Sequence, residues 1–449
     1  MVPPMKRSVR IGCGAGFSSD RLEPAIDLAQ RGALDYLVFE CLGERTMAFG
    51  HRDRMLDGSK GYNPHTAQRM RAVLAACRKN GTVIVTNMGA ANPLAATQLT
   101  VGIARELGLA GLKVACVEGD DVTRQIGPAT ALHDRDGTVR DVGLSVVGAN
   151  AYLGADALLP ALKAGADVII AGRIADPSLF VAPLAFRFGW GLDDWQLLGR
   201  GTAVGHLLEC GMQVTGGYFA DPGFKDVPGL VDCGFPIAEV GFDGGFTVTK
   251  LPDTGGCVTT ATVKEQLLYE VHDPATYLTP DVTADFSRIA IQQLETDRVQ
   301  VNGADGQPRP DKLKVTIGFD GGFLAEGGIS YAGPNAQARA RLAGEVVWQR
   351  LSRNNALLGD LRIDMIGVNS LHGTAHMPPT DSEDVRLRVA MRSRRREDID
   401  TMLWEVEALL CCGPAGGGGY RGTISPCVVT HSALVARDQV RPTMRMFTA

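Results

Sequence analysis

The chain has 449 residues, of which 45% are hydrophobic and 21% are charged, and its formal net charge is −5. This composition is typical of a globular enzyme of two or three domains, and the acidic balance does not favour nucleic acid or an anionic membrane surface as a partner. No apolar run of about 18 residues is present, and the N-terminal MVPPMKRS is too polar for a signal peptide, so we expect a cytoplasmic protein. The ten cysteines are scattered without a CxxC pair, which predicts reduced thiols.

The most informative stretch is 9–21, VRIGCGAGFSSDR, in which a short apolar strand ends in closely spaced glycines. A helical run follows up to Gly32, and residues 34–42, LDYLVFECL, read as a second strand. Strand, glycine loop, helix and strand form a βαβ unit. Glycines let the backbone approach a ligand, and amides at a helix N-terminus hold anions. This unit therefore predicts an acidic small molecule bound over the loop.

The same alternation continues through the N-terminal part of the chain. We expect strands at 82–86, 113–117, 142–147 and 167–171, and helices at 65–79, 94–107 and 156–163. Apolar strands that alternate with amphipathic helices are typical of a parallel sheet covered on both faces. The predicted fold class is therefore α/β: a three-layer, mostly parallel, Rossmann-like sheet with a second α+β domain. A β/α barrel-like core is the alternative.

The rest of the chain has a different texture. Residues 190–250 are irregular, whereas an alternating strand at 312–317 and a helix at 335–351 indicate an α+β arrangement. A strand at 385–391 and a helix at 397–410 precede the glycine-rich CCGPAGGGGYRG and a polar tail. The predicted domains are a parallel core at 7–250, an α+β domain at 251–380, and a C-terminal strand, helix and glycine-rich tail at 381–449.

Polar residues follow nearly every predicted strand of the core. Because parallel strands point their carboxyl ends at one edge of a sheet, we expect these residues to share a single site. Arginines there can clamp a carboxylate, amides can support a developing enolate, and carboxylates can move protons. The predicted catalytic residues are Glu40, Glu118 and Asp120. The predicted substrate-binding residues are Gly14, Gly16, Ser18, Asp20, Arg21, Asn87, Asn92, Asn150, Arg173 and Asp176.

Each of these motifs also has a structural interpretation. Asp20 with Arg21 suits the start of a helix, where an acidic side chain meets the positive end of the dipole. Arg173 and Asp176 suit a pair that holds a loop. Glu118, Asp120 and Asp121 place three carboxylates within four residues. This cluster indicates a site for a divalent metal such as Mg²⁺, a carboxyl with a raised pKa, or a solvated turn.

Other motifs fit known chemistry less well. The third glycine of the dinucleotide fingerprint G-x-G-x-x-G would fall at Phe17, although Glu40 lies near where a ribose-binding acid is expected. His372 and His376 have helical spacing, but the glycine and threonine between them disfavour a helical zinc site. Cys210 and Cys257 have no visible base beside them in the sequence. The sequence contains neither a G-x-S-x-G elbow nor a P-loop.

Several long motifs spread along the chain resemble one protein family. They are GCGAGFSSDR at 12–21, LDYLVFECLGERTMA at 34–48, KGYNP at 60–64, TNMGAANP at 86–93, AGRIADPS at 171–178, TGGYFADPG at 215–223, VKEQLLYEVHDPATYLTPDV at 263–282 and ISYAGPNA at 329–336. Through them most of the chain is similar to the acyclic terpene utilisation (AtuA-type) family. The resemblance implies catabolism of branched acids, often as thioesters, without assigning a reaction. Larger members resemble this core followed by a small ferredoxin-like domain that we expect to be missing here, which implies a separate small subunit.

Together these features predict an enzyme of small carboxylate or acyl-thioester catabolism, most simply a lyase of hydratase type. In this hypothesis Glu40, Glu118 or Asp120 removes an α-proton, Arg21 or Arg173 holds the substrate acid, and the amides of Asn87 and Asn92 support the enolate. Two alternatives stay open: a non-catalytic subunit or ligand-binding module of a complex, and a nicotinamide-dependent oxidoreductase. The cofactor is unknown beyond the candidate Mg²⁺ site.

The expected partners follow from the same reasoning. They are a small-molecule acid or CoA thioester, the separate small ferredoxin-like subunit, and further copies of the chain in a homo-oligomer. We expect neither nucleic acid nor a membrane as a partner.

Overall fold

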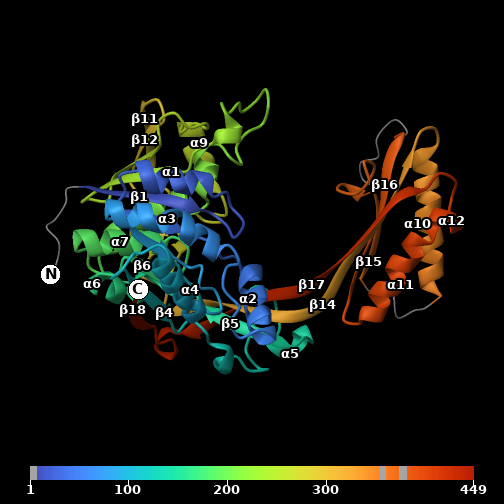
Figure 1. The fold of residues 1–449 in the computed structure, drawn as a ribbon, viewed down its shortest axis with the longest axis horizontal. Helices are drawn as coiled ribbons and strands as arrows, with labels where there is room; N and C mark the ends of the chain where they lie inside the picture. The colour runs from blue at the N-terminus through green and yellow to red at the C-terminus, as the bar shows by residue number, and fades with distance from the viewer. Residues whose placement is uncertain (1–7, 354–359, 374–381) are drawn as a thin grey trace. The chain divides into compact units, whose positions relative to one another are not determined.

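The computed structural model describes residues 8–353, 360–373 and 382–449 (Figure 1). The chain divides into two compact units, Met1–Gly318 with Thr430–Ala449, and Phe319–Val429. These units do not coincide with the three segments 7–250, 251–380 and 381–449. The reason is that strands from the second and third segments complete the sheet of the first. Among the described residues no helix is long and apolar enough to cross a membrane.

The first unit contains a ten-stranded open sheet. In sheet order its strands are β11 (Ala290–Glu295), β12 (Arg298–Asn302), β8 (Phe246–Lys250), β7 (Pro236–Gly241), β1 (Ser8–Ala15), β2 (Tyr36–Phe39), β3 (Val83–Thr86), β6 (Val168–Ala171), β4 (Lys113–Glu118) and β18 (Thr443–Thr448). The run from β1 to β4 is parallel, while the strands beyond it on both sides pair antiparallel. The predicted α/β class with an open sheet is confirmed, and the barrel alternative is wrong. The antiparallel extension was not predicted.

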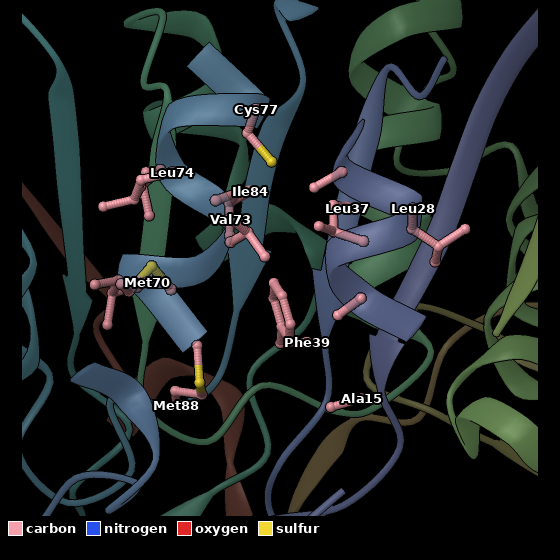
Figure 2. Close-up of a cluster of buried hydrophobic side chains, with 14 of the residues drawn as sticks. Ala15, Leu28, Leu37, Phe39, Met70, Val73, Leu74, Cys77, Ile84 and Met88 are labelled. Atoms are coloured by element: carbon pink, nitrogen blue, oxygen red, sulfur yellow. The ribbon is translucent and has the colours of Figure 1, made fainter. Parts of the chain in front are cut away.

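The parallel strands are buried on both faces, which explains their unbroken apolar sequences. All four residues of β2, Tyr-Leu-Val-Phe, are buried. Since side chains alternate across a sheet, Leu37 and Phe39 share one face. Figure 2 shows these two side chains among apolar residues of the neighbouring helices, including Leu28 and Val73.

Helices cover both faces of the sheet. The face that bears Leu37 packs against α1 (Glu23–Arg31), α3 (Thr66–Asn80) and α4 (Pro93–Glu106). On the other face α7 (Ser178–Phe188) contacts β1 and β2, and α8 (Trp195–Leu208) packs on α7. Helix α7 is buried around most of its circumference, because α8 covers the side that the sheet leaves free. The remaining helices of this unit are α2 (Glu44–Leu56), α5 (Val139–Val142), α6 (Leu159–Lys163) and α9 (Thr260–Leu268).

Two parts of the unit differ from the predicted pattern. The predicted polar tail contains β18, which pairs with β4 at the sheet edge (Figure 1). The predicted strand 142–147 is replaced by α5 and by β5 (Val146–Ala151), which pairs with β14 (Lys312–Ala332) instead of joining the main sheet. None of the residues of β18 is fully buried, so hydrophobic periodicity does not reveal this edge strand. A small separate sheet is formed by β9 (Tyr277–Leu278), β10 (Thr283–Asp285) and β13 (Asp305–Gln307).

The second unit has β-α-β-β-α-β order. It contains part of β14, α10 (Ala336–Ser352), β15 (Leu361–Ile366), β16 (Asp384–Ser393), α11 (Arg396–Glu407), the short α12 (Leu409–Cys412) and part of β17 (Gly418–Ala436). The strands lie in the order β15-β16-β14-β17, and buried side chains of α10 and α11 pack with those of the sheet. This is the ferredoxin-like arrangement. We expected such a domain only outside this chain, and the chain contains one.

Candidate functional site

A cavity of about 830 Å³ lies at the carboxyl ends of β1, β2 and β6 in the first unit. Its lining includes Asp20 after β1, Glu40 after β2, Arg173 after β6 and Glu209 after α8. Ligand sites in parallel α/β proteins occur at this edge, because the strand ends present loops of several segments to one crevice. The cavity therefore occupies the place that the strand pattern predicted for the site.

Arg173 is the most buried charge in the cavity, with an exposed fraction of 2%. Its Nη1 donates to the carbonyl oxygen of Leu42 (2.6 Å) and lies 3.2 Å from Oδ1 of Asp176. The guanidinium carbon lies 4.1 Å from the ring centroid of Tyr152, in a cation–π contact. Burial alone would lower the pKa of Arg173, but Asp176, Tyr152 and Glu40 outweigh it and raise this pKa. Nε of Arg173 has no hydrogen-bond partner, so the cation retains a free donor inside the protein.

Three carboxyl groups line the same cavity: those of Glu40 and Glu209 are buried, and that of Asp176 is partly exposed. Oε1 of Glu40 accepts hydrogen bonds from the amide of Leu42 (2.8 Å) and from Nδ2 of Asn87 (2.9 Å). Burial raises the pKa of all three groups, and repulsion from Asp176 adds to the pKa of both Glu40 and Glu209. Oδ1 of Asp176 and Oε2 of Glu209 have no hydrogen-bond partner. Carboxyls with raised pKa values are suited to proton transfer near neutral pH.

Glu209 is connected to the buried imidazole of His206. The Oε1 atom of Glu209 lies 3.1 Å from Nδ1 of His206, and Nε2 of His206 lies 3.2 Å from the carbonyl oxygen of Leu267. The ring packs against Tyr277 and Phe286, with centroid separations of 5.2 and 5.6 Å. Burial lowers the pKa of His206 to about 4. The imidazole is therefore neutral at physiological pH.

A second charged cluster, formed by Glu44, Tyr152 and Lys314, also lines the cavity. Oε1 of Glu44 accepts hydrogen bonds from the hydroxyl of Tyr152 (2.9 Å) and from Nζ of Lys314 (3.1 Å). Burial alone would raise the pKa of Glu44, but its own backbone amide and the cations Lys314 and Arg173 lower it to about 2. Glu44 is therefore ionised and holds Tyr152 against the guanidinium.

The remaining lining is largely apolar and aromatic. It includes Phe17, Met212, Tyr218, Leu278 and Leu434. The exposed fraction of Tyr218 reaches 75%, which is unusual for a large aromatic side chain. A buried cation among carboxyls, combined with such a lining, suits a ligand that has one acidic end and one apolar end.

Six of the predicted residues line the cavity: Gly16, Ser18, Asp20, Glu40, Arg173 and Asp176. Asn87 lies behind Glu40 and orients it through the hydrogen bond described above. The side chain of Asp20 contacts the loop that follows β1, since its Oδ2 accepts a hydrogen bond from the amide of Gly16 (2.9 Å). Burial raises the pKa of Asp20.

Asp120 and Asn150 lie in a layer behind the cavity. Oδ2 of Asp120 accepts hydrogen bonds from the amide of Arg173 and from Nδ2 of Asn150, each at 2.8 Å. Oδ1 of Asn150 lies 2.5 Å from Nε2 of His51. Burial raises the pKa of Asp120. These residues hold the loop that carries Arg173, and neither of them lines the cavity.

The other predicted residues lie away from the cavity. Glu118 forms an ion pair with Arg445 of β18. Asp121 accepts a hydrogen bond from the amide of Thr123 (3.0 Å). Arg21 donates to the carbonyl of Val231, Asn92 caps α4, and Gly14 lies against the ring of Phe39. The carboxylates of Glu118, Asp120 and Asp121 each have separate partners, and no group of His, Cys, Asp or Glu within the described residues is arranged to hold a metal ion.

Gly12 and Gly14, within β1, and Gly16, directly after it, are explained by close packing within the protein. A Cβ atom on Gly14 would lie 2.7 Å from the Phe39 ring, and one on Gly16 would lie 2.3 Å from the carbonyl carbon of Cys210. Gly12 is similarly crowded by Leu34. These contacts account for glycine at all three positions, so the spacing gives no support to a dinucleotide fingerprint. The predicted histidine pair cannot be assessed, because His376 lies outside the described residues.

The sequence interpretation missed Glu209, His206, Glu44 and Tyr152. Glu209 directly precedes Cys210, which was the candidate residue of this segment because of its thiol. Cys210 does line the cavity, but burial raises its pKa, which disfavours a nucleophilic thiolate. The sequence did contain a signal for Glu209, because it is a carboxylate at the end of an apolar helix. Charged residues are rarely buried without a partner, so such a position indicates a partner or a function.

A comparison with protein-family models matches residues 9–446 to the family described as acyclic terpene utilisation family protein AtuA. No curated protein and no solved structure matches the chain.

Proposed function

Since the chain belongs to the acyclic terpene utilisation family, we propose that it is an enzyme of small carboxylate or acyl-thioester catabolism, a lyase of hydratase type. The family description concerns the use of acyclic terpenes, which are branched hydrocarbon skeletons. The observation that carries the proposal is the buried guanidinium of Arg173, with an unpartnered Nε, among the carboxyls of Glu40, Asp176 and Glu209.

Arg173 is the proposed binding group for the substrate's carboxylate or thioester oxygen. A guanidinium in a site of low dielectric stabilises negative charge strongly, and this charge grows as an enolate forms. The cation is already fixed by the carbonyl of Leu42 and by the ring of Tyr152. Little reorganisation is then required when the substrate binds, which favours electrostatic catalysis.

Glu40 is the proposed base. Its Oε1 atom is held by the amides of Leu42 and Asn87, so the carboxyl has one orientation in the cavity. In the elimination direction the Glu40 carboxylate removes the α-proton, the bond between Cβ and the hydroxyl oxygen breaks, and the departing hydroxide takes a proton from a second carboxyl to leave as water. In the addition direction each transfer is reversed, so the protons balance without a redox partner.

The apolar part of the cavity sets the proposed substrate class. An acid or thioester with a branched chain would place its acyl oxygen at Arg173 and its chain against residues such as Phe17, Met212 and Leu278. A small hydrophilic acid would leave this surface in contact with water. Apolar burial contributes about 25 cal/mol per Å², so branched substrates are expected to bind more tightly.

The experiment is a screen of unsaturated and β-hydroxy branched acids and their thioesters, in D₂O, by NMR. Exchange of the α-proton reports the base, and interconversion of hydroxy and unsaturated forms reports the complete reaction. Glu40→Gln is expected to abolish both signals, and Arg173→Lys is expected to raise KM, because lysine lacks the planar fork. Glu118→Gln serves as a matched control, since Glu118 lies outside the cavity and pairs with Arg445.

The outcomes separate the competing functions. Wild-type turnover that persists in Glu40→Gln would contradict the proposed base. Saturable binding of branched acids that depends on Arg173, without exchange or turnover for any substrate, would indicate a non-catalytic ligand-binding module. Loss of activity in Glu118→Gln equal to that in Glu40→Gln would contradict the location of the site.

A further inference from the structure

Hydrogen-bond geometry specifies which proton His206 carries. The carbonyl oxygen of Leu267 can only accept, so Nε2 of His206, at 3.2 Å, is the donor in this contact. A neutral imidazole with hydrogen on Nε2 has a bare Nδ1, which can only accept. The atom that faces Nδ1 is Oε1 of Glu209, at 3.1 Å, and an oxygen of a carboxyl donates only when it is protonated.

The alternative is an ion pair, in which imidazolium donates to a Glu209 carboxylate. Burial argues against it, because the exposed fractions of His206 and Glu209 are only 1% and 8%. The imidazole is enclosed by Tyr277 and Phe286, and Oε2 of Glu209 has no hydrogen-bond partner. An ionised carboxylate with an unpartnered oxygen would pay a large desolvation penalty, whereas a neutral acid needs only one acceptor for its hydrogen.

The charges around Glu209 favour the same state. Asp176 and Glu270 face it with like charge, Arg173 faces it with opposite charge, and Cys210 and Tyr277 are the other titratable neighbours. Oδ1 of Asp176 lies 3.2 Å from Nη1 of Arg173. This ion pair weakens the attraction of Arg173 for a charge on Glu209. Burial and the two carboxylates raise the pKa of Glu209, while burial lowers that of His206.

We infer that Glu209 rests in the cavity as a neutral carboxylic acid hydrogen-bonded to Nδ1 of neutral His206, and that it is the group that protonates the leaving hydroxyl. The second half of this inference rests on the proposed function, whereas the protonation state does not. His206 is a positioning residue, because it turns the acid and holds its proton without lining the cavity. When the hydroxyl departs, the carboxyl of Glu209 breaks its hydrogen bond to Nδ1 of His206 and gives its proton to the hydroxyl, and the resulting carboxylate regains a proton from solvent or from the acid formed on Glu40.

The protonation state can be tested on the ligand-free protein by infrared spectroscopy. The difference spectrum between wild type and Glu209→Gln at neutral pH is expected to contain the carbonyl band of a protonated carboxylic acid, which shifts in D₂O. Glu106→Gln is the matched control, because Glu106 is exposed and paired with Arg71. Its difference spectrum is expected to contain only carboxylate bands. Carboxylate bands alone for Glu209→Gln would overturn the inference.

Nitrogen NMR of protein labelled in histidine provides a second measurement that needs no variant with altered charge in the cavity. His206, identified by the signals that disappear in His206→Phe, is expected to show hydrogen on Nε2 and a bare Nδ1 at neutral pH. Two protonated nitrogens would indicate the ion pair and contradict the neutral acid.

The proposed role of Glu209 as proton donor is tested by comparing the rate of α-proton exchange with the rate of water elimination. Glu209→Gln is expected to retain α-proton exchange, which depends on Glu40, and to lose roughly 10²–10⁴-fold in water elimination. Equal loss of both signals would show that Glu209 has a structural role only. Retention of both would show that another group is the donor. If wild type itself gives no turnover, the proposed function is wrong. The infrared and NMR measurements still test the protonation state of Glu209 in that case.

Discussion

The guanidinium carbon of Arg173 lies over the ring of Tyr152, 4.1 Å from the ring centroid. Nζ of Lys314 lies 4.9 Å from the same centroid. One aromatic ring thus contacts two cations, and its hydroxyl donates to the carboxylate of Glu44, which neutralises part of their charge. This arrangement fixes the cation of the cavity by contacts to an aromatic face and leaves its Nε free for a ligand.

We expect the ring of Tyr152 to matter more than its hydroxyl. Tyr152→Phe keeps the ring and loses the bond to Glu44, so the free energy of unfolding should fall by about 1 kcal/mol. Tyr152→Leu also loses the cation–π contact, and a further loss of about 2 kcal/mol is expected because Arg173 is desolvated. Urea denaturation of both variants measures the difference. Equal effects of the two substitutions would show that the ring contact contributes nothing.

Asp120 should affect activity through the loop that it holds. In Asp120→Ala the amide of Arg173 and Nδ2 of Asn150 both lose Oδ2, the buried acceptor that they share. An unsatisfied buried donor lowers the free energy of unfolding by about 1–3 kcal/mol, and the displaced Arg173 should raise KM. The matched control is Asp121→Ala, which removes an acceptor of Thr123 in an exposed turn, where water can replace it, and should change stability by at most about 1 kcal/mol. Identical effects of both variants would refute the positioning role.

Gly16 should not tolerate even a methyl group. The Cβ atom of Gly16→Ala would lie 2.3 Å from the backbone of Cys210, so either the loop or the end of α8 must move. We expect a loss of about 1–3 kcal/mol in stability and reduced activity, since Glu209 precedes Cys210. Gly102→Ala is the control, because Gly102 lies within α4 with open space at its Cβ position. Its stability should rise by up to about 1 kcal/mol.

Asp281 should make stability depend on pH. It is buried, its Oδ1 accepts from the amide of Ala155 (2.7 Å), its Oδ2 accepts from Ser178 (2.5 Å), and burial raises its pKa to about 6. Between pH 4 and 6 the folded state therefore holds a proton that the unfolded state has released. The contribution of Asp281 to stability is complete below about pH 4 and is lost as pH rises to 6.

Asp281→Asn should remove this slope. Urea denaturation between pH 4 and 7 compares it with wild type and with Asp285→Asn, whose carboxylate is bonded to Ser287 in an exposed turn. The lowered pKa of His206 gives the opposite slope in the same range, but it is present in all three proteins and cancels in the comparison. A wild type and an Asp281→Asn variant with parallel pH profiles would contradict the buried neutral acid.

Local sequence determined the repeating part of this fold. Unbroken apolar strands such as β2 can be predicted from the sequence, because they are buried on both faces of the sheet. Amphipathic helices such as α3 can be predicted because they are buried on one side only. The same reasoning placed Asp20, Glu40, Arg173 and Asp176 at one edge, since parallel strands share a direction. It could not distinguish Arg173, which lines the cavity, from Arg21, which does not, because both follow a strand.

Only the tertiary structure decided the remainder. Strand β18 lies beside β4, and its partner is separated from it by more than three hundred residues, which no local pattern encodes. Glu209 enters the cavity from the end of α8, and His206 precedes it by one helical turn, but their role depends on Leu267 and Tyr277 from another part of the chain. Periodicity reports how much of each side chain is buried. It does not report which distant group lies opposite, and that identity determines where a proton resides.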